Sequence, residues 1–374
     1  MTVLAGLRVL ELAGLGPGPF AAMLLADLGA DVVVVDRPGG VHTPAGGPTD
    51  NLTNRGKRSV ALDLKTPEGV ATALDLAARA DVLIEGFRPG VCERLGLGPE
   101  RCWERNPALV YGRMTGWGQD GPLAATAGHD LSYLALSGVL HAIGNADAKP
   151  QVPLNLVGDF GGGSLYLVVG LLAALRHAER TGRGQVVDAA IVDGAAHLGT
   201  LFHGMLASGL WEDRRGVNLL DSGAPFYDTY ETADGRYMAV AALEPQFYAE
   251  FVRLLGLPES DAGQQMDQGS WPGLRNRIAT AFRSRTRDEW AKVFEMSDAC
   301  VSPVLSLREA PDHPHLAARG AFTAPGGVRQ PVPAPRFSET PPPAGWPPPV
   351  PGTHTAEVLI DWGVRDDAAK EDLR

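Results

Sequence analysis

The beginning of the chain alternates between short β-rich runs and runs whose apolar residues have helical spacing. The β-rich runs are LRVLEL (7–12), DVVVVD (31–36) and DVLIEGF (81–87), and the helical runs are PFAAMLLADLGA (19–30) and TPEGVATALDLAARA (66–80). Thr66 is a typical helix cap, followed by Pro67 and Glu68 in the first turn. This alternation predicts βαβ units and an open, mainly parallel sheet.

The hydrophobic pattern changes twice further along the chain. The run GDFGGGSLYLVVGLLAALRHAER (158–180) is a glycine-rich turn followed by a nearly all-apolar helix, which predicts a buried helix. The run APFYDTYETADGRYMAVAAL (224–243) consists of two aromatic, β-rich segments joined by Ala-Asp-Gly, which predicts a hairpin. The proline-dense segment 331–352 must be extended, and 353–363 reads as a short closing helix.

These segments predict an α/β protein with two domains. We expect a large α/β domain over 1–190, a linker over 191–224 and a smaller α+β domain over 225–310. The remaining segment, 311–374, reads as a proline-rich strap and C-terminal helix that complete the large domain.

Composition and charge exclude several classes of protein. The 374 residues are 44% hydrophobic and 21% charged, and no apolar run reaches the roughly 18 residues that a membrane span needs. A net charge of −11 disfavours nucleic acid and anionic membranes, so an anionic ligand requires a local cluster of Arg and Lys. The three cysteines have no metal-ligand spacing and the N-terminus does not resemble a signal peptide, which favours a cytoplasmic protein without a metal.

One motif suggests a dinucleotide site. Residues 11–37 read as strand, glycine loop, helix and strand, with Asp36 where a ribose-binding acid would stand. However, Pro19 replaces the third glycine of the fingerprint, which disfavours NAD binding. A tight turn between strand and helix is the simpler interpretation, and it leaves Arg37 free to face a phosphate.

Several longer runs carry a family resemblance. They are NRGKRSVALDLK (54–65), DVLIEGFRPGVCERLGLGP (81–99), GRMTGWGQDGP (112–122), GHDLSYLALSGVL (128–140), PLNLVGDFGGG (153–163), GRGQVVDAAIVDG (182–194) and GTHTAEVL (352–359). In this order they resemble the class III CoA-transferase family (CaiB/BaiF), and within it the α-methylacyl-CoA racemases. The resemblance implies a Rossmann-like large domain, a small domain and a homodimer of two interlocked chains.

The resemblance also implies a binding site for the CoA part of an acyl-CoA substrate, with no separate cofactor. Basic side chains suit the phosphates of CoA, and apolar ones such as Leu62 and Phe87 can cover the adenine. For Lys57 and Arg58 a role at the phosphates and a solvated surface position are equally open. The positions that match the family's CoA contacts are Arg37, Ala61, Leu62, Asp63, Lys65, Gly86, Phe87, Arg94 and Gly128.

The racemase resemblance assigns catalysis to His129, Asp159 and Glu244. Inversion at C2 of a 2-methylacyl thioester needs one group to remove the α-proton and another to return a proton on the opposite face. His129 and Asp159 match these two groups, and Glu244 matches a carboxylate that pairs with the histidine, often across the dimer interface. Asp130 adjoins His129 and is assigned no catalytic role. Gly158–Gly163 could lend backbone N–H groups to the thioester oxygen or permit close helix packing.

The alternative is a CoA-transferase in which Asp159 attacks the acyl carbonyl as a nucleophile. The family's transferases lack the histidine of the GHD motif and carry a glycine-rich loop, whereas the matching stretch NLLDSGAPFYDTY (218–230) has one glycine. The sequence does not choose among methyl-branched fatty acyl, sterol side-chain and arylpropionyl thioesters.

Overall fold

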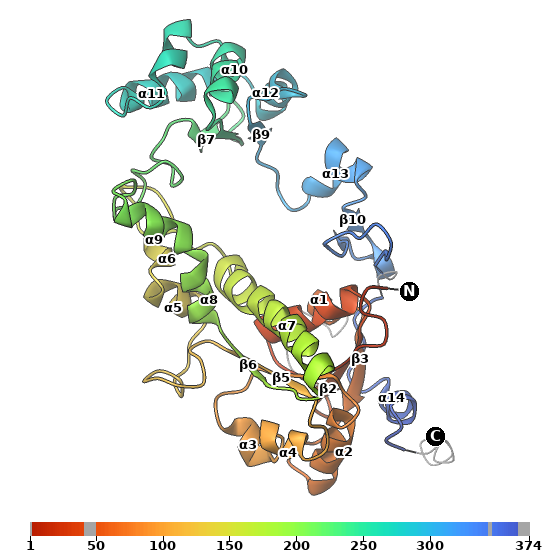
Figure 1. The fold of residues 1–374 in the computed structure, drawn as a ribbon. Coiled ribbons are helices and arrows are strands. Elements are labelled where there is room, and N and C mark those ends of the chain that lie inside the picture. Colours follow the sequence, from red (N-terminus) through yellow and green to blue (C-terminus); the bar gives the residue numbers. More distant parts are fainter. Residues whose placement is uncertain (1, 41–49, 343–345, 366–374) are drawn as a thin grey trace. The chain divides into compact units, whose positions relative to one another are not determined.

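The computed structural model describes residues 2–40, 50–342 and 346–365, which form two compact units (Figure 1). The first unit comprises Met1–Ser137, Leu154–Leu198 and Arg319–Arg374, and the second comprises Gly138–Pro153 and Gly199–Ala318. The domain limits expected from the sequence stay a prediction.

The first unit contains a six-stranded sheet in the order β3-β2-β1-β4-β5-β6, and every pair of neighbours is parallel. This is the strand order of a Rossmann fold, in which successive strands are added to one side of β1 up to β3 and to the other side from β4 onward. The predicted α/β fold with a parallel sheet is therefore confirmed. The strands are β1 (Arg8–Leu12), β2 (Asp31–Asp36), β3 (Arg58–Ala61), β4 (Val82–Glu85), β5 (Val110–Thr115) and β6 (Val186–Ala190).

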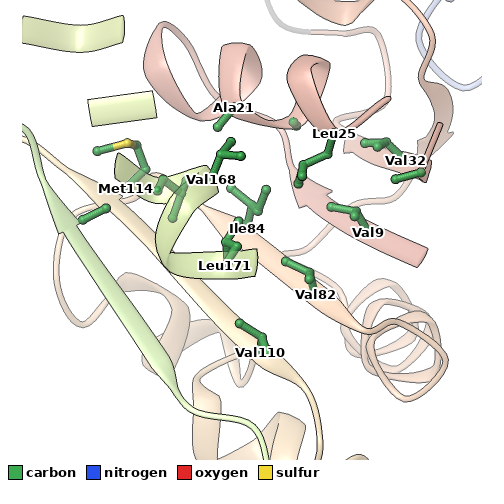
Figure 2. Packing of buried hydrophobic residues seen from close by; sticks show 14 of the residues in the cluster. Val9, Ala21, Leu25, Val32, Val82, Ile84, Val110, Met114, Val168 and Leu171 are labelled. Carbon is green, nitrogen blue, oxygen red and sulfur yellow. The ribbon is translucent and has the colours of Figure 1, made fainter. Parts of the chain in front are cut away.

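Helices cover both faces of this sheet, and each face has its own apolar core. On one face, Val9, Ile84 and Val110 of the strands pack against α1 and α7 (Figure 2). On the other face, Leu10 and Tyr111 belong to a second cluster with α2, α3, α4 and α14. The helices named here are α1 (Pro17–Asp27), α2 (Pro67–Ala77), α3 (Val91–Leu95), α4 (Pro99–Trp103), α7 (Leu165–Thr181) and α14 (Thr355–Asp361).

Shorter elements complete the first unit. They are η2 (Leu52–Asn54), α5 (Asp130–Leu136), the π-helical segment η3 (Leu156–Ser164), α8 (Ile191–Leu198), β10 (Phe322–Thr323), η6 (Pro325–Gly327) and β11 (Gln330–Pro331). Residues 352–354 pack on the edge strand β3, where the His354 N–H donates to the Ser59 carbonyl and the Gly352 N–H to the Ser59 hydroxyl. Arg58 adds ion pairs to Asp31 and Asp361, so its charge is used within the fold.

The glycine-rich apolar segment differs from its prediction in one respect. Leu167 and Leu171 of α7 are fully buried against the sheet, whereas Leu165 and Val169 are 50% and 66% exposed. The helix therefore buries only one of its apolar faces, because the opposite face points away from the sheet. The expectation that no apolar run reaches the length of a membrane span is wrong by this measure, because the segment Leu156–Thr181 is long and apolar enough to cross a membrane; core helices of soluble proteins share this property.

The second unit is built around an antiparallel sheet in the order β7-β8-β9. The predicted hairpin is confirmed, and Gly235 adopts the left-handed φ of 71° that the turn requires. Phe226, Phe251 and Phe282 lie in an aromatic core beneath it. Its elements are α6 (Val139–Ala142), α9 (Thr200–Ala207), β7 (Tyr227–Glu231), β8 (Tyr237–Ala241), α10 (Pro245–Leu255), η4 (Glu259–Gln264), α11 (Trp271–Phe282), α12 (Arg287–Phe294), β9 (Val301–Pro303), η5 (Ala310–Asp312) and α13 (Pro314–Ala318).

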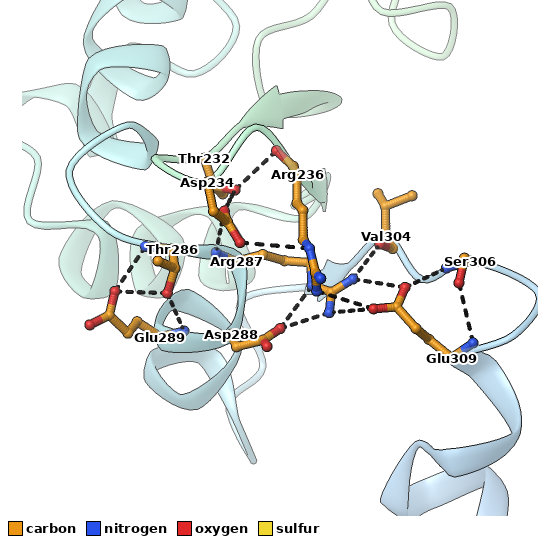
Figure 3. Close-up of polar contacts among 10 residues, drawn as sticks. All are labelled: Thr232, Asp234, Arg236, Thr286, Arg287, Asp288, Glu289, Val304, Ser306 and Glu309. Carbon is orange, nitrogen blue, oxygen red and sulfur yellow. Dashed lines mark hydrogen bonds and ion pairs between the residues drawn. The ribbon is translucent and has the colours of Figure 1, made fainter.

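A polar network ties the hairpin of the second unit to the segment after β9 (Figure 3). Arg287 donates two hydrogen bonds to Glu309, and the Arg287 N–H donates to Asp234 in the hairpin turn. The guanidinium of Arg287 lowers the pKa of Glu309 to about 2. Thr286 and Glu289 form a capping box at the start of α12, so the network is seated on a fixed helix end.

Candidate active site

A cavity of about 430 Å³ opens at the carboxyl edge of the parallel sheet, at the ends of the neighbouring strands β1 and β4. Ligands of open α/β sheets bind at this position, because the connections on either side of it leave in opposite directions. Its walls come from the ends of β1, β4 and β5 and from the segments that follow them. The residues that line it include Glu11, Gly16, Pro17, Pro19, Gly86, Phe87, Arg88, Trp117, Gly128, His129, Asp130, Tyr133 and Asp159.

His129 lies on the cavity wall as the N-cap residue of α5, and its side chain is solvent-exposed. The turn before it depends on small residues. A Cβ on Gly128 would lie 2.6 Å from Cε1 of Tyr133, and one on Gly116 would lie 2.0 Å from Cζ of the same ring. Glycine at both positions therefore lets the buried Tyr133 ring pack beneath the turn, edge to face with Trp117.

Asp159 lies on the cavity wall within η3, half-buried. Burial raises the pKa of its carboxyl group, and this effect exceeds the opposing hydrogen bond that the Asn155 amide donates at 3.3 Å. His129 is close enough for its charge to lower the pKa of Asp159 slightly. The structure thus brings the two predicted acid/base residues to one cavity.

Asp130 links these two residues, a role that the sequence did not suggest. Its Oδ1 accepts a hydrogen bond of 2.8 Å from the backbone N–H of Asp159, although it follows His129 directly in the chain. A Cβ on Gly158 would lie 2.3 Å from this Oδ1, so glycine is needed there for the contact. Asp130 therefore sets where the η3 turn lies relative to the His129 turn.

The glycines of η3 serve helix packing. A Cβ on Gly162 would lie 2.6 Å from the Ala195 nitrogen, and one on Gly194 would lie 1.8 Å from the Gly162 carbonyl oxygen. Backbones of η3 and α8 are thus in direct contact. The N–H of Asp159 is already bonded to Asp130, so this group is not free for a thioester oxygen.

The residues matched to CoA contacts gather at the same edge of the sheet. Arg37 follows β2, and Ala61, Leu62, Asp63 and Lys65 end or follow β3, which pairs with β2 through Asp36 and Ala61. Gly86, Phe87 and Gly128 line the cavity, whereas the others do not. Arg37, Lys65 and Arg94 are exposed, and Leu62 and Phe87 pack on the core. Arg88, which the sequence analysis did not single out, is an exposed cation on the cavity wall.

Asp36 and Glu244, which the sequence also singled out, do not line the cavity. Asp36 is buried and accepts a hydrogen bond from the Ser59 hydroxyl, and burial raises its pKa, so it is not available as a ribose-binding acid. Glu244 is the exposed N-cap residue of α10 in the second unit, and its pairing with His129 stays a prediction. Among the described residues no group of His, Cys, Asp or Glu could hold a metal.

Comparison with known proteins identifies the family. The family model for CoA-transferase family III matches residues 4–355. The chain belongs to this family. It is 48% identical over 363 residues to the α-methylacyl-CoA racemase of Mus musculus, covering 96% of this chain and 93% of the relative, and 47% identical to the human enzyme of that name at the same coverage. A CaiB/BaiF family protein from Brucella suis has the same fold, with a TM-score of 0.83 at 29% identity, covering 96% of this chain and 99% of that one.

Proposed function

We propose that this member of CoA-transferase family III is an α-methylacyl-CoA racemase, which interconverts (R)- and (S)-2-methylacyl-CoA thioesters. The observation that carries the proposal is the presence of His129 and Asp159 on the walls of one cavity. The high identity to two enzymes named α-methylacyl-CoA racemase, over nearly the whole chain, supports the same assignment.

The reaction needs only proton transfers. The neutral imidazole of His129 accepts the α-proton, and the C–H electron pair moves into the thioester carbonyl to give an enolate. The protonated carboxyl group of Asp159 then donates a proton to the other face of C2. For the opposite enantiomer the two groups exchange roles. Burial raises the pKa of Asp159, which is the direction that a proton donor needs.

Binding of the CoA moiety falls to the exposed carboxyl edge of the sheet. Arg37, Arg88 and Arg94 supply positive charge for phosphates in a protein of net charge −11, and Phe87 offers an apolar surface. Glu244 would pair with His129 and fix its tautomer. No cofactor beyond the CoA of the substrate is required by this chemistry.

We also propose that the protein is a homodimer. Apolar side chains of α7 and α8 in the first unit are exposed, including Leu165, Val169 and Leu198, and such an exposed apolar surface is unusual on a monomer. A second copy of the chain would cover it.

The test is hydrogen exchange at C2. One enantiomer of a 2-methylacyl-CoA, incubated with the protein in D2O, should gain deuterium at C2 and invert while the thioester stays intact. His129→Ala and Asp159→Asn should each slow inversion by roughly 100- to 10,000-fold, because each removes one of two required groups. Residual exchange with retention can persist through the group that remains.

The same samples test the transferase alternative. A transferase would move the acyl group between CoA and an added carboxylate, with the C2 hydrogen retained. Acyl transfer without C2 exchange would overturn the racemase proposal. Full inversion activity in His129→Ala would remove the proposed role of that residue.

A further inference from the structure

Lys57 is an ammonium group sealed inside the first unit. Its side chain has no solvent exposure, and Nζ lies 2.6 Å from Oε2 of Glu11, at the end of β1. Nζ also donates to the carbonyl oxygen of Pro19 and to Oδ1 of Asn54, both at 3.0 Å. The ammonium group thus makes two hydrogen bonds and one ion pair, all to oxygen atoms of the protein. Lys57 is therefore neither a phosphate ligand nor a solvated surface charge.

The Pro19 carbonyl belongs to a segment, Gly16–Phe20, that lies directly against Asp159. A Cβ on Gly16 would lie 3.5 Å from Oδ2 of Asp159. The Ser164 hydroxyl lies 2.7 Å from the Pro17 carbonyl oxygen and 3.1 Å from that of Asp159.

A ring contact adds to this packing. Phe20 stacks on Phe160, the neighbour of Asp159, with ring centroids 4.3 Å apart. Gly16, Pro17 and Pro19 also line the cavity. A shift of the segment therefore changes both the cavity wall and the surroundings of the Asp159 carboxylate.

We propose that Lys57 and Ser164 are positioning residues that hold the Gly16–Phe20 segment, by its Pro19 and Pro17 carbonyls, against the Asp159 carboxylate. The proposal rests on the racemase function, in which Asp159 must face C2 of the substrate. Burial lowers the pKa of Lys57 and raises that of Glu11, yet a neutral amine still has N–H donors for Pro19. The hydrogen bond from Lys57 to the Pro19 carbonyl therefore forms whether or not Lys57 and Glu11 are charged.

The neighbouring cation provides a matched control. Arg58 is next to Lys57 in the sequence, but its guanidinium pairs with Asp31 and Asp361, and it does not line the cavity. Arg58→Met removes ion pairs to Asp31, Glu357 and Asp361, none of which belongs to the Gly16–Phe20 segment. It should lower the melting temperature and leave turnover unchanged.

The test uses the double variant Glu11→Gln/Lys57→Met, since removing only one partner of a buried ion pair leaves an uncompensated group. In D2O, with single enantiomers of a 2-methylacyl-CoA, its inversion rate should fall roughly 10- to 100-fold, as expected for a displaced reacting group. For the enantiomer whose α-proton His129 removes, deuterium exchange at C2 with retained configuration should fall much less than inversion.

Ser164→Ala removes the second hydrogen bond to the segment and tests the proposal in a variant that loses one oxygen atom. It should shift the ratio of exchange to inversion in the same direction, by a smaller factor. If the folded double variant has the same ratio of C2 exchange to inversion as the parent protein, the proposal is overturned. If the double variant does not fold, the same result in Ser164→Ala overturns it. Failure of the racemase function itself is distinct, because the parent protein would then show no C2 exchange.

Discussion

The hydrogen bond between Asp130 and the Asp159 N–H offers a sharp test of how the two acid/base residues are held. Asp130→Ala removes the acceptor, which is 2.8 Å from a backbone donor within η3. Asp130→Asn keeps an oxygen in the same place and removes only the charge. Any difference between the two variants therefore reports the hydrogen bond.

The magnitudes follow from the environment of Asp130, which is 9% exposed and stands in the first turn of α5. A hydrogen bond to a charged group contributes about 1.5–3 kcal/mol. A carboxylate at a helix start adds about 0.3–1 kcal/mol. Asp130→Ala should therefore cost about 2–4 kcal/mol. Asp130→Asn keeps a neutral hydrogen bond of about 0.5–1.5 kcal/mol and should cost about 1–2.5 kcal/mol.

The turnover number kcat should fall less in Asp130→Asn than in Asp130→Ala. Release of the Asp159 turn in Asp130→Ala should lower kcat by roughly 10- to 100-fold, as is typical of displacements on the order of 1 Å. Asp130→Asn should remain close to the parent. Both variants remove a negative charge that raises the pKa of Asp159, so this shift does not account for a difference between them.

The assay combines melting temperature with racemisation kinetics on purified proteins. The expected order for both quantities is parent, then Asp130→Asn, then Asp130→Ala. Equal turnover in the two variants would show that the bond to Asp159 does not position the reacting groups, and the linking role of Asp130 would have to be abandoned.

The remaining predictions concern binding, pH and assembly. Arg37→Ala and Arg94→Ala should raise KM with little change in kcat, because contacts to phosphates far from C2 contribute alike to ground and transition states; unchanged KM in both would remove the proposed phosphate site. Burial raises the pKa of Glu85 to about 7, so its native form holds a proton more tightly than the unfolded chain and its stabilising contribution is lost as pH rises from about 4.5 to 7. Glu85→Gln should therefore melt higher than the parent at about pH 8 and not at about pH 4, and an equal melting temperature at the higher pH would contradict the burial argument. Light scattering across a dilution series should show a dimer, and a well-folded monomer at micromolar concentration would contradict the homodimer.

The parallel sheet could be predicted because local pattern determines it. DVVVVD and DVLIEGF are strands buried on both faces, as continuous apolar runs indicate, and the intervening helical spacing enforces a parallel crossover. The extent of burial of α7 could not be predicted in the same way. Leu165 and Leu167 are equally apolar in sequence, and only the position of the sheet decides which of them is covered.

His129 and Asp159 could be proposed from sequence only through the family motifs, since nothing local marks a lone His or Asp as catalytic. Asp130 shows what such motifs leave out. Its side chain bonds to the backbone of a residue 29 positions away. A contact of that kind depends on how η3 and α5 pack, which no periodicity or spacing encodes.

The position of Lys57 was predicted wrongly, because the usual exposure of lysine side chains points to the surface. Lysine is almost never fully buried without a partner, so a solvated or phosphate-facing position was the natural expectation. The sheet overrides that tendency by placing Glu11 of β1, Asn54 of η2 and the Pro19 carbonyl of α1 around one point. Each of these oxygens is ordinary in its own segment. Together they form a site for a single ammonium group, beside the segment that lies against Asp159, so the polar anchor of the cavity wall arises from tertiary structure alone.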